Sequence, residues 1–90
     1  MVKAVITVIG EDKVGIIAGI SNILAKCNVN ILDISQTIMH NVFTMVMMVD
    51  ISEMCTDFAD LSQELETKGR ELQMTIRVQH VDIFKSMHRI

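Results

Sequence analysis

Hydrophobic residues in this chain switch between the two-residue spacing of strands and the wider spacing of helices, and the order of these stretches restricts the fold more than any other feature. The order is strand, helix, strand, strand, helix, strand, which is the split βαβ arrangement. We therefore predict an α+β domain of the ferredoxin-like βαββαβ type, with two helices on one face of a four-stranded antiparallel sheet. Strands are predicted at residues 2–9, 29–39, 42–51 and 72–79, and helices at residues 16–27 and 57–69.

The length of the chain allows one hydrophobic core. It has 90 residues, of which 50% are hydrophobic, and this suits a single small domain with no second core. We place that domain at residues 1–81. Residues 82–90 carry apolar side chains at helical spacing, so we predict a short amphipathic C-terminal helix as a tail.

The second and third strands are predicted to form a hairpin. The apolar positions of residues 29–39 change phase, which indicates a β-bulge and favours an edge strand. His40 and Asn41 are predicted to form the tight turn, because Asn tolerates a positive φ. The strand after the turn is apolar on both faces, so we expect part of it, including Met45 and Met47, to contact another subunit.

Three residues are predicted to mark helix ends. Asn28 follows the first helix and suits a left-handed C-terminal cap. Thr56 is the predicted N-cap of the second helix, and Gly69 is its predicted end. We find no linker and no internal repeat in the predicted domain.

Charge and cysteine content exclude some classes of partner. The net charge is −3 and the eight Lys and Arg residues are scattered, which argues against a nucleic-acid surface. No apolar run predicts a signal peptide or a membrane-spanning helix. Cys27 and Cys55 do not form a CxxC motif, so we expect free thiols and a cytoplasmic protein.

The segment from Gly10 to Ile16 is the strongest candidate for a binding site. Its glycines permit close approach of a ligand, and the following helix would present free N–H groups to a carboxylate or another anion. The alternative is that Gly10 and Gly15 only make a tight connection. The three histidines lack zinc-ligand spacing, and no catalytic motif occurs, so we predict no catalytic residue, no metal and no cofactor.

The run GEDKVGIIAGISNILAKCNVNILDISQTI resembles the first half of an ACT domain. In that family a strand leads into a G-x-D-x-x-G-I loop, then a helix, then a strand that starts with N-I. The resemblance extends over about Lys3 to Gln79. The DISQT run and the FTM run make it closest to small stand-alone ACT proteins (UPF0237-like) and to the ACT modules of the glycine cleavage system repressor and formyltetrahydrofolate deformylase. The residues that match the motif are Gly10, Asp12, Gly15, Ile16, Asn30 and Ile31.

The resemblance implies a regulatory module that binds a small molecule, with an amino acid as the expected ligand, at the interface of a homodimer or higher homo-oligomer. It also implies a protein partner, such as an enzyme or a regulator. Val14 stands where many members have Pro, and Asn28 stands where Gly is common. Carried over by position, the expected ligand-binding residues are Gly10, Glu11, Asp12, Lys13, Val14, Gly15, Ile16, Asn28, Asn30 and Ile31.

Two other functions stay open. The first is a protein–protein interaction or dimerisation domain without a ligand. The second, ranked well below it, is a small ferredoxin-like enzyme such as an acylphosphatase, which would need an Arg in the first loop to hold phosphate, whereas this loop offers Lys13. An RNA-recognition module is disfavoured because the strands lack stacking aromatic residues, and a metallochaperone because the first loop lacks paired cysteines.

Overall fold

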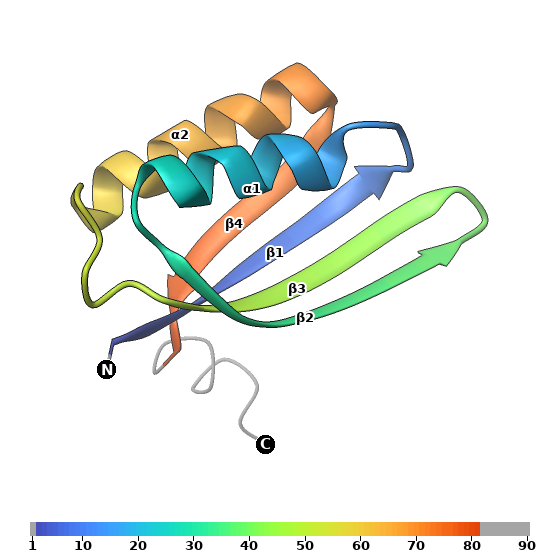
Figure 1. The fold of residues 1–90 in the computed structure, drawn as a ribbon. Coiled ribbons are helices and arrows are strands. Elements are labelled where there is room, and N and C mark those ends of the chain that lie inside the picture. Colours follow the sequence, from blue (N-terminus) through green and yellow to red (C-terminus); the bar gives the residue numbers. More distant parts are fainter. Residues whose placement is uncertain (1, 82–90) are drawn as a thin grey trace.

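The computed structural model describes residues 2–81, which form one sheet covered by two helices (Figure 1). The tail predicted at residues 82–90, with its short helix, lies outside the described residues. The observed order confirms the predicted βαββαβ arrangement. The elements are β1 (Lys3–Glu11), α1 (Ile16–Lys26), β2 (Asn30–Met39), β3 (Val42–Asp50), α2 (Phe58–Leu72) and β4 (Met74–His80).

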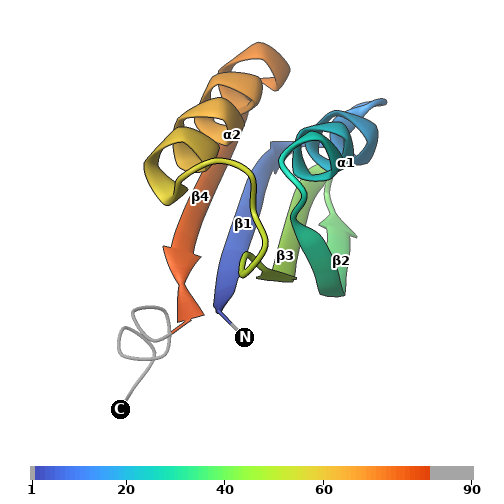
Figure 2. The same ribbon diagram turned by 60° about the vertical axis from the view of Figure 1, so that its left-hand side comes forward.

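The sheet has the strand order β2-β3-β1-β4, and every neighbouring pair is antiparallel. Both helices lie on the same face of this sheet, as Figure 2 shows. This arrangement confirms the ferredoxin-like prediction. Within residues 2–81, no helix lies on the other face of the sheet, and β2 and β4 are the two edge strands.

A bulge interrupts β2 near its start, as the change of phase in the sequence predicted. Ile31 pairs with Val49 and Asp33 pairs with Met48, so that Leu32 has no opposite residue on β3. The strand also occupies an edge of the sheet, which is where bulges are most common. Because of this extra residue, Ile34 and Ile38 lie on the same face of the sheet as Ile31, opposite buried residues of β3.

The core lies between the helices and the sheet. The predicted stripe of α1 is buried from Ile16 to Cys27, and alternate residues of each inner strand join it. Met45 and Met47 are 1% and 0% exposed and point into this core. The expectation that they contact another subunit is therefore wrong, because they lie on the face of β3 that this chain's own helices cover.

The second helix begins one residue later than predicted. Its N-cap is Asp57, whose carboxylate accepts a hydrogen bond from the amide of Asp60 at 2.8 Å. Thr56, the predicted cap, instead lies within 3.5 Å of the Asp60 carboxylate through its hydroxyl. A carboxylate at the N-cap also suits the positive end of the helix dipole.

The second helix also ends later than predicted. Gly69 is a buried position inside α2, and the helix continues to Leu72. Gln73 then takes a left-handed conformation with φ 58° and caps the helix. Gly69 is required for a different reason: a Cβ there would lie 2.8 Å from the carbonyl oxygen of Met74 on the adjoining strand.

Candidate functional site

The first half of the predicted first loop belongs to a strand. Gly10 and Glu11 are the last residues of β1, and Gly10 pairs with both Phe43 and Met74. A Cβ on Gly10 would lie 2.5 Å from the sulfur of Met74, so this glycine allows β1 to pack closely against β4. The close approach of these two strands is therefore one reason for a glycine at this position.

The loop that follows is anchored at two points. The amide of Asp12 donates to the carbonyl oxygen of Asn41 in the β2–β3 turn at 2.8 Å. The ammonium group of Lys13 donates to the side-chain oxygen of Gln73 at 3.1 Å. Val14 is fully exposed between these anchors and the helix. The carboxylate of Asp12 is exposed and has no polar partner within residues 2–81.

Gly15 begins α1 in a way that leaves the helix N-terminus open. Its φ is 93°, which favours glycine, and no side chain caps the helix. Apart from its chain neighbours, no atom of the described residues lies within 4 Å of the position that a Cβ on Gly15 would take, and the first turn contains no acidic residue. The amides of Ile16 and Ile17 are therefore placed to donate to a carboxylate.

The second predicted group lies at the other end of α1. Asn28 has φ 60°, as its predicted capping role requires, and its side-chain amide donates to the carbonyl oxygen of Glu53 at 2.8 Å. Asn30 starts β2 opposite Asp50, and Ile31 is partly buried against the core. A hollow of about 320 Å³ is lined by Asn28, Val29, Asn30, Asp50 and Glu53.

This hollow has an acidic wall. The side-chain hydroxyl and the backbone amide of Ser52 both donate to the Asp50 carboxylate, at 2.5 and 2.9 Å. These hydrogen bonds lower the pKa of Asp50 below its ordinary value, because they stabilise the charged form. Asp50 and Glu53 therefore give this end of the molecule the charge that would attract an ammonium group.

Within one chain, the two groups of predicted ligand residues lie far apart. Glu11 pairs with Val42 beside the hairpin turn, whereas Asn30 pairs with Asp50 at the opposite end of the hairpin. The 11 residues of α1 separate them, and at 1.5 Å per residue they span about 16 Å. The residues from Gly10 to Ile16 thus lie at one end of α1, and Asn28, Asn30 and Ile31 lie at the other.

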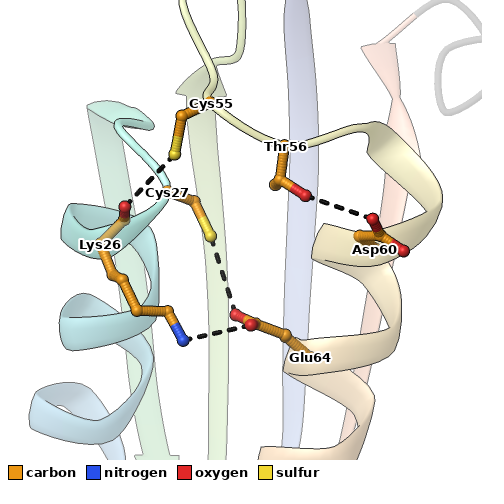
Figure 3. A network of polar contacts seen from close by, with 6 residues as sticks. All are labelled: Lys26, Cys27, Cys55, Thr56, Asp60 and Glu64. Atoms are coloured by element: carbon orange, nitrogen blue, oxygen red, sulfur yellow. Dashed lines mark hydrogen bonds and ion pairs between the residues drawn. The ribbon is translucent and has the colours of Figure 1, made fainter.

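A network between the helices was not expected from the sequence. Glu64 of α2 forms an ion pair with Lys26 at 3.1 Å and accepts a hydrogen bond from the Cys27 thiol at 3.7 Å (Figure 3). The Cys55 thiol contacts the carbonyl oxygen of Lys26 at 3.4 Å. The sequence shows Glu64 only as part of the solvated side of a helix, because its partner depends on how the helices pack.

The helices border a larger hollow of about 550 Å³. It contains none of the predicted ligand residues, and its wall mixes acidic and basic side chains. Within residues 2–81, no three His, Cys, Asp or Glu side chains come close enough to share a metal ion. Its lining residues are Ile23, Lys26, Thr56, Asp60, Gln63, Glu64, Thr67, Lys68 and Glu71.

Residues 3–79 match the family model of the ACT domain. The chain belongs to the ACT domain family. This ACT domain is 60% identical over 90 residues to a UPF0237 protein of Methanocaldococcus jannaschii, and the match covers all of both chains. It also resembles the solved structure of an ACT domain protein from Streptococcus pneumoniae, with a TM-score of 0.79, 44% identity, and coverage of 92% of this chain and 93% of that one. The family resemblance predicted from the sequence is confirmed.

A second structural likeness concerns the fold alone. A formyltetrahydrofolate deformylase from Pseudomonas syringae has a TM-score of 0.82 and 23% identity. The match covers 89% of this chain but 28% of that one. The ACT domain described here thus corresponds to one part of that larger protein.

Proposed function

We propose that this ACT domain is a regulatory module that binds a free amino acid, and that it binds this ligand as a homodimer. ACT domains are commonly small-molecule regulatory modules. One observation carries the proposal: the predicted ligand residues form two groups at opposite ends of α1 and of β2, an edge strand whose outer edge has no partner strand among residues 2–81.

Pairing of β2 with β2 of a second copy would join these two groups. In an antiparallel pair related by a two-fold axis, the start of one strand lies beside the end of the other. Asn30 starts β2 and Met39 ends it, and the turn after Met39 is bonded to Asp12. The first loop of one subunit would then approach Asn30 of the partner subunit, and each dimer would contain two equivalent sites.

The side chains of β2 support this pairing. Leu32, Ile34 and Ile38 are 39%, 42% and 57% exposed, so three apolar side chains of one edge strand contact water. Ile34 and Ile38 share the helix-covered face of the sheet, since they pair with buried residues of β3. An apolar edge of this kind is typical of a contact surface, and a second copy would remove it from water.

The two ends of the proposed site match the two charges of an amino acid. The open N-terminus of α1 offers amides to a carboxylate. The hollow beside Asn28 and Asn30 offers Asp50 and Glu53 to an ammonium group. The exposed carboxylate of Asp12 in the same loop would attract the ammonium group of a ligand held between the two subunits, so its removal tests the loop directly.

The first test is a thermal-shift screen of the amino acids, followed by calorimetry on each compound that raises the melting temperature. A ligand that binds only the folded protein stabilises it by mass action. We expect Asp12→Ala to abolish the response, whereas Glu66→Ala, an exposed acidic residue of α2, should retain it. A panel with no response in the wild-type protein would contradict the amino-acid proposal.

Mixed dimers test whether two subunits build each site. Asp12→Ala and Asn30→Ala should each bind poorly alone, because both sites of each homodimer carry the substitution. Mixing the two variants should restore binding, since one site of every mixed dimer is then intact. Failure of the mixture to bind, with mixed dimers shown by mass spectrometry, would refute a shared site.

The face of the sheet away from both helices favours a second candidate function, a ligand-free interaction or dimerisation domain. Ile9, Val42 and Val46 are 45%, 47% and 36% exposed there, and they lie on the face away from both helices. The pairing of Ile9 with Thr44 and of Glu11 with Val42 places them on adjacent strands. Dimerisation without any ligand response would support this function.

We assign no enzyme activity to the chain. The acylphosphatase alternative requires a guanidinium group in the first loop, and the ammonium group there, Lys13, is bonded to Gln73. No helix within the described residues is long and apolar enough to cross a membrane. Both cysteines are free thiols, which supports action in a reducing compartment such as the cytoplasm, where the module would contact an enzyme or regulator.

A further inference from the structure

The two cysteines of the chain lie side by side, although they are far apart in the sequence. The amide of Cys55 donates to the carbonyl oxygen of Cys27 at 2.9 Å. Figure 3 shows the β3–α2 connection, which carries Cys55, passing the end of α1. This hydrogen bond makes the two residues neighbours in space, which a disulfide bond between them requires. The chain has no other cysteine that could compete.

The two thiols differ in access. Cys55 is exposed, and its sulfur contacts the carbonyl oxygen of Lys26 at 3.4 Å. Cys27 is 4% exposed, and its sulfur lies 3.7 Å from the Glu64 carboxylate. An oxidant in solution therefore reaches Cys55 first. Because the two sulfurs contact different groups, the Cys55 side chain has to turn toward Cys27 before a bond between them forms.

The surroundings of Cys27 suit a thiol that reacts second. Burial raises the pKa of the Cys27 thiol, and the negative charge of Glu64 raises it further. The thiol consequently keeps its proton at neutral pH, and Glu64 Oε2 is positioned to accept that proton when the sulfur attacks. Lys26, at 3.1 Å from the other oxygen of Glu64, holds the carboxylate in place.

We propose that Cys27 and Cys55 form a reversible disulfide when the protein meets a hydroperoxide. The Cys55 sulfur attacks a peroxide oxygen: an S–O bond forms, the O–O bond breaks, and water leaves with the thiol proton. The Cys27 sulfur then attacks the Cys55 sulfenic acid, so that the S–S bond forms and the S–O bond breaks. Glu64 takes the Cys27 proton and returns it to the departing hydroxide, which leaves as water.

This sequence is balanced in atoms and electrons. The two thiols together lose two electrons and two hydrogen atoms, and one hydrogen peroxide is reduced to two waters. A low-molecular-weight thiol reverses the reaction by thiol–disulfide exchange. The bond would tie the end of α1 to the β3–α2 connection, next to Asn28, and would remove the contact between Cys27 and Glu64.

The test begins with the reduced wild-type protein and hydrogen peroxide at neutral pH. We expect the intact mass to fall by two hydrogen atoms, both titratable thiols to disappear, and the chain to remain a monomer on a denaturing gel without reductant. Dithiothreitol should restore the starting mass. Addition of oxygen atoms at Cys55 with Cys27 still free, or a disulfide formed only between chains, would overturn the proposal.

Variants separate the two steps. Cys27→Ser should stop at the Cys55 sulfenic acid, which dimedone traps, and Cys55→Ser should retain an unmodified Cys27. In Glu64→Gln the sulfenic acid should accumulate, because the second step loses its proton acceptor, whereas the matched control Glu66→Gln should behave as wild type. An unchanged rate in Glu64→Gln would refute the role given to Glu64. Circular dichroism before oxidation confirms that each variant is folded.

Discussion

Alanine at Gly69 should destabilise the protein, whereas the same substitution at Gly19 should stabilise it. Both glycines lie inside helices, Gly69 in α2 and Gly19 in α1. In a helix interior, alanine is favoured over glycine by roughly 0.8–1 kcal/mol. This gain applies to both positions, so the difference between the two variants comes from the space around the new methyl group.

That space differs sharply between the two positions. At Gly19 the new Cβ would lie 3.5 Å from Lys68 Cδ and 3.6 Å from Leu72 Cδ1, which are ordinary contacts with flexible side chains. At Gly69 it would lie 2.8 Å from the carbonyl oxygen of Met74 and 3.1 Å from Ile76 Cγ1. The first of these atoms belongs to the backbone of β4 and moves only if the strand moves.

The expected magnitudes follow from these contacts. Overpacking of a core costs about 1–3 kcal/mol, and a clash with backbone belongs at the upper end of that range. We expect Gly69→Ala to lower the free energy of unfolding by about 2 kcal/mol, after the helical gain of about 1 kcal/mol is included. Gly19→Ala should raise it by up to about 1 kcal/mol, which corresponds to roughly 4–8 °C in melting temperature for a domain of this size.

Urea unfolding followed by circular dichroism measures both changes. The two variants and the wild-type protein are compared at one protein concentration, because self-association would make the stability concentration-dependent. Equal stability of Gly69→Ala and Gly19→Ala would refute the reasoning, since it would mean that α2 and β4 separate without loss. A destabilised Gly19→Ala would show that the contact between α1 and α2 is tighter than described.

Three further predictions concern single groups. Asp57→Ala removes the N-cap of α2 and should lower the free energy of unfolding by about 1 kcal/mol, measured by urea unfolding. The folded pKa of Asp50 lies below its unfolded value, so its stabilising contribution is present above the unfolded pKa and is lost as the pH falls through the folded one. Ser52→Ala should raise the Asp50 pKa in an NMR titration, and an unchanged pKa would contradict the assigned cause. Because the Cys27 pKa is raised and the residue is buried, iodoacetamide should alkylate Cys55 first, as peptide mass spectrometry would show.

Local features of the fold could be predicted because neighbouring residues determine them. The change of phase in β2 required a bulge, and the bulge lies at Leu32. His40 and Asn41 both have positive φ, as the predicted turn required. The predicted end of α2 was wrong. A glycine is needed at position 69 because β4 packs closely against the helix there, and nothing near Gly69 in the sequence indicates that contact.

The candidate site could be predicted only in part, for a related reason. The sequence identifies the loop from Gly10 to Ile16 and the residues around Asn30 as two groups. Their placement at opposite ends of α1 follows from the path of the chain through the sheet. The contact between Cys27 and Glu64 depends on the packing of one helix against another, and no spacing within the chain predicts it.

The bulge in β2 has a consequence for how copies of this domain can polymerise. In the part of the chain that the structure describes, β2 and β4 each have one unpaired edge, and joining β2 of one copy to β4 of the next would extend a sheet without limit. The bulge at Leu32 interrupts the regular hydrogen-bond ladder of β2, so only the stretch from Asp33 to Met39 can accept another strand in register. Deleting Leu32 would restore a long regular edge, and with it a route to fibrous aggregates.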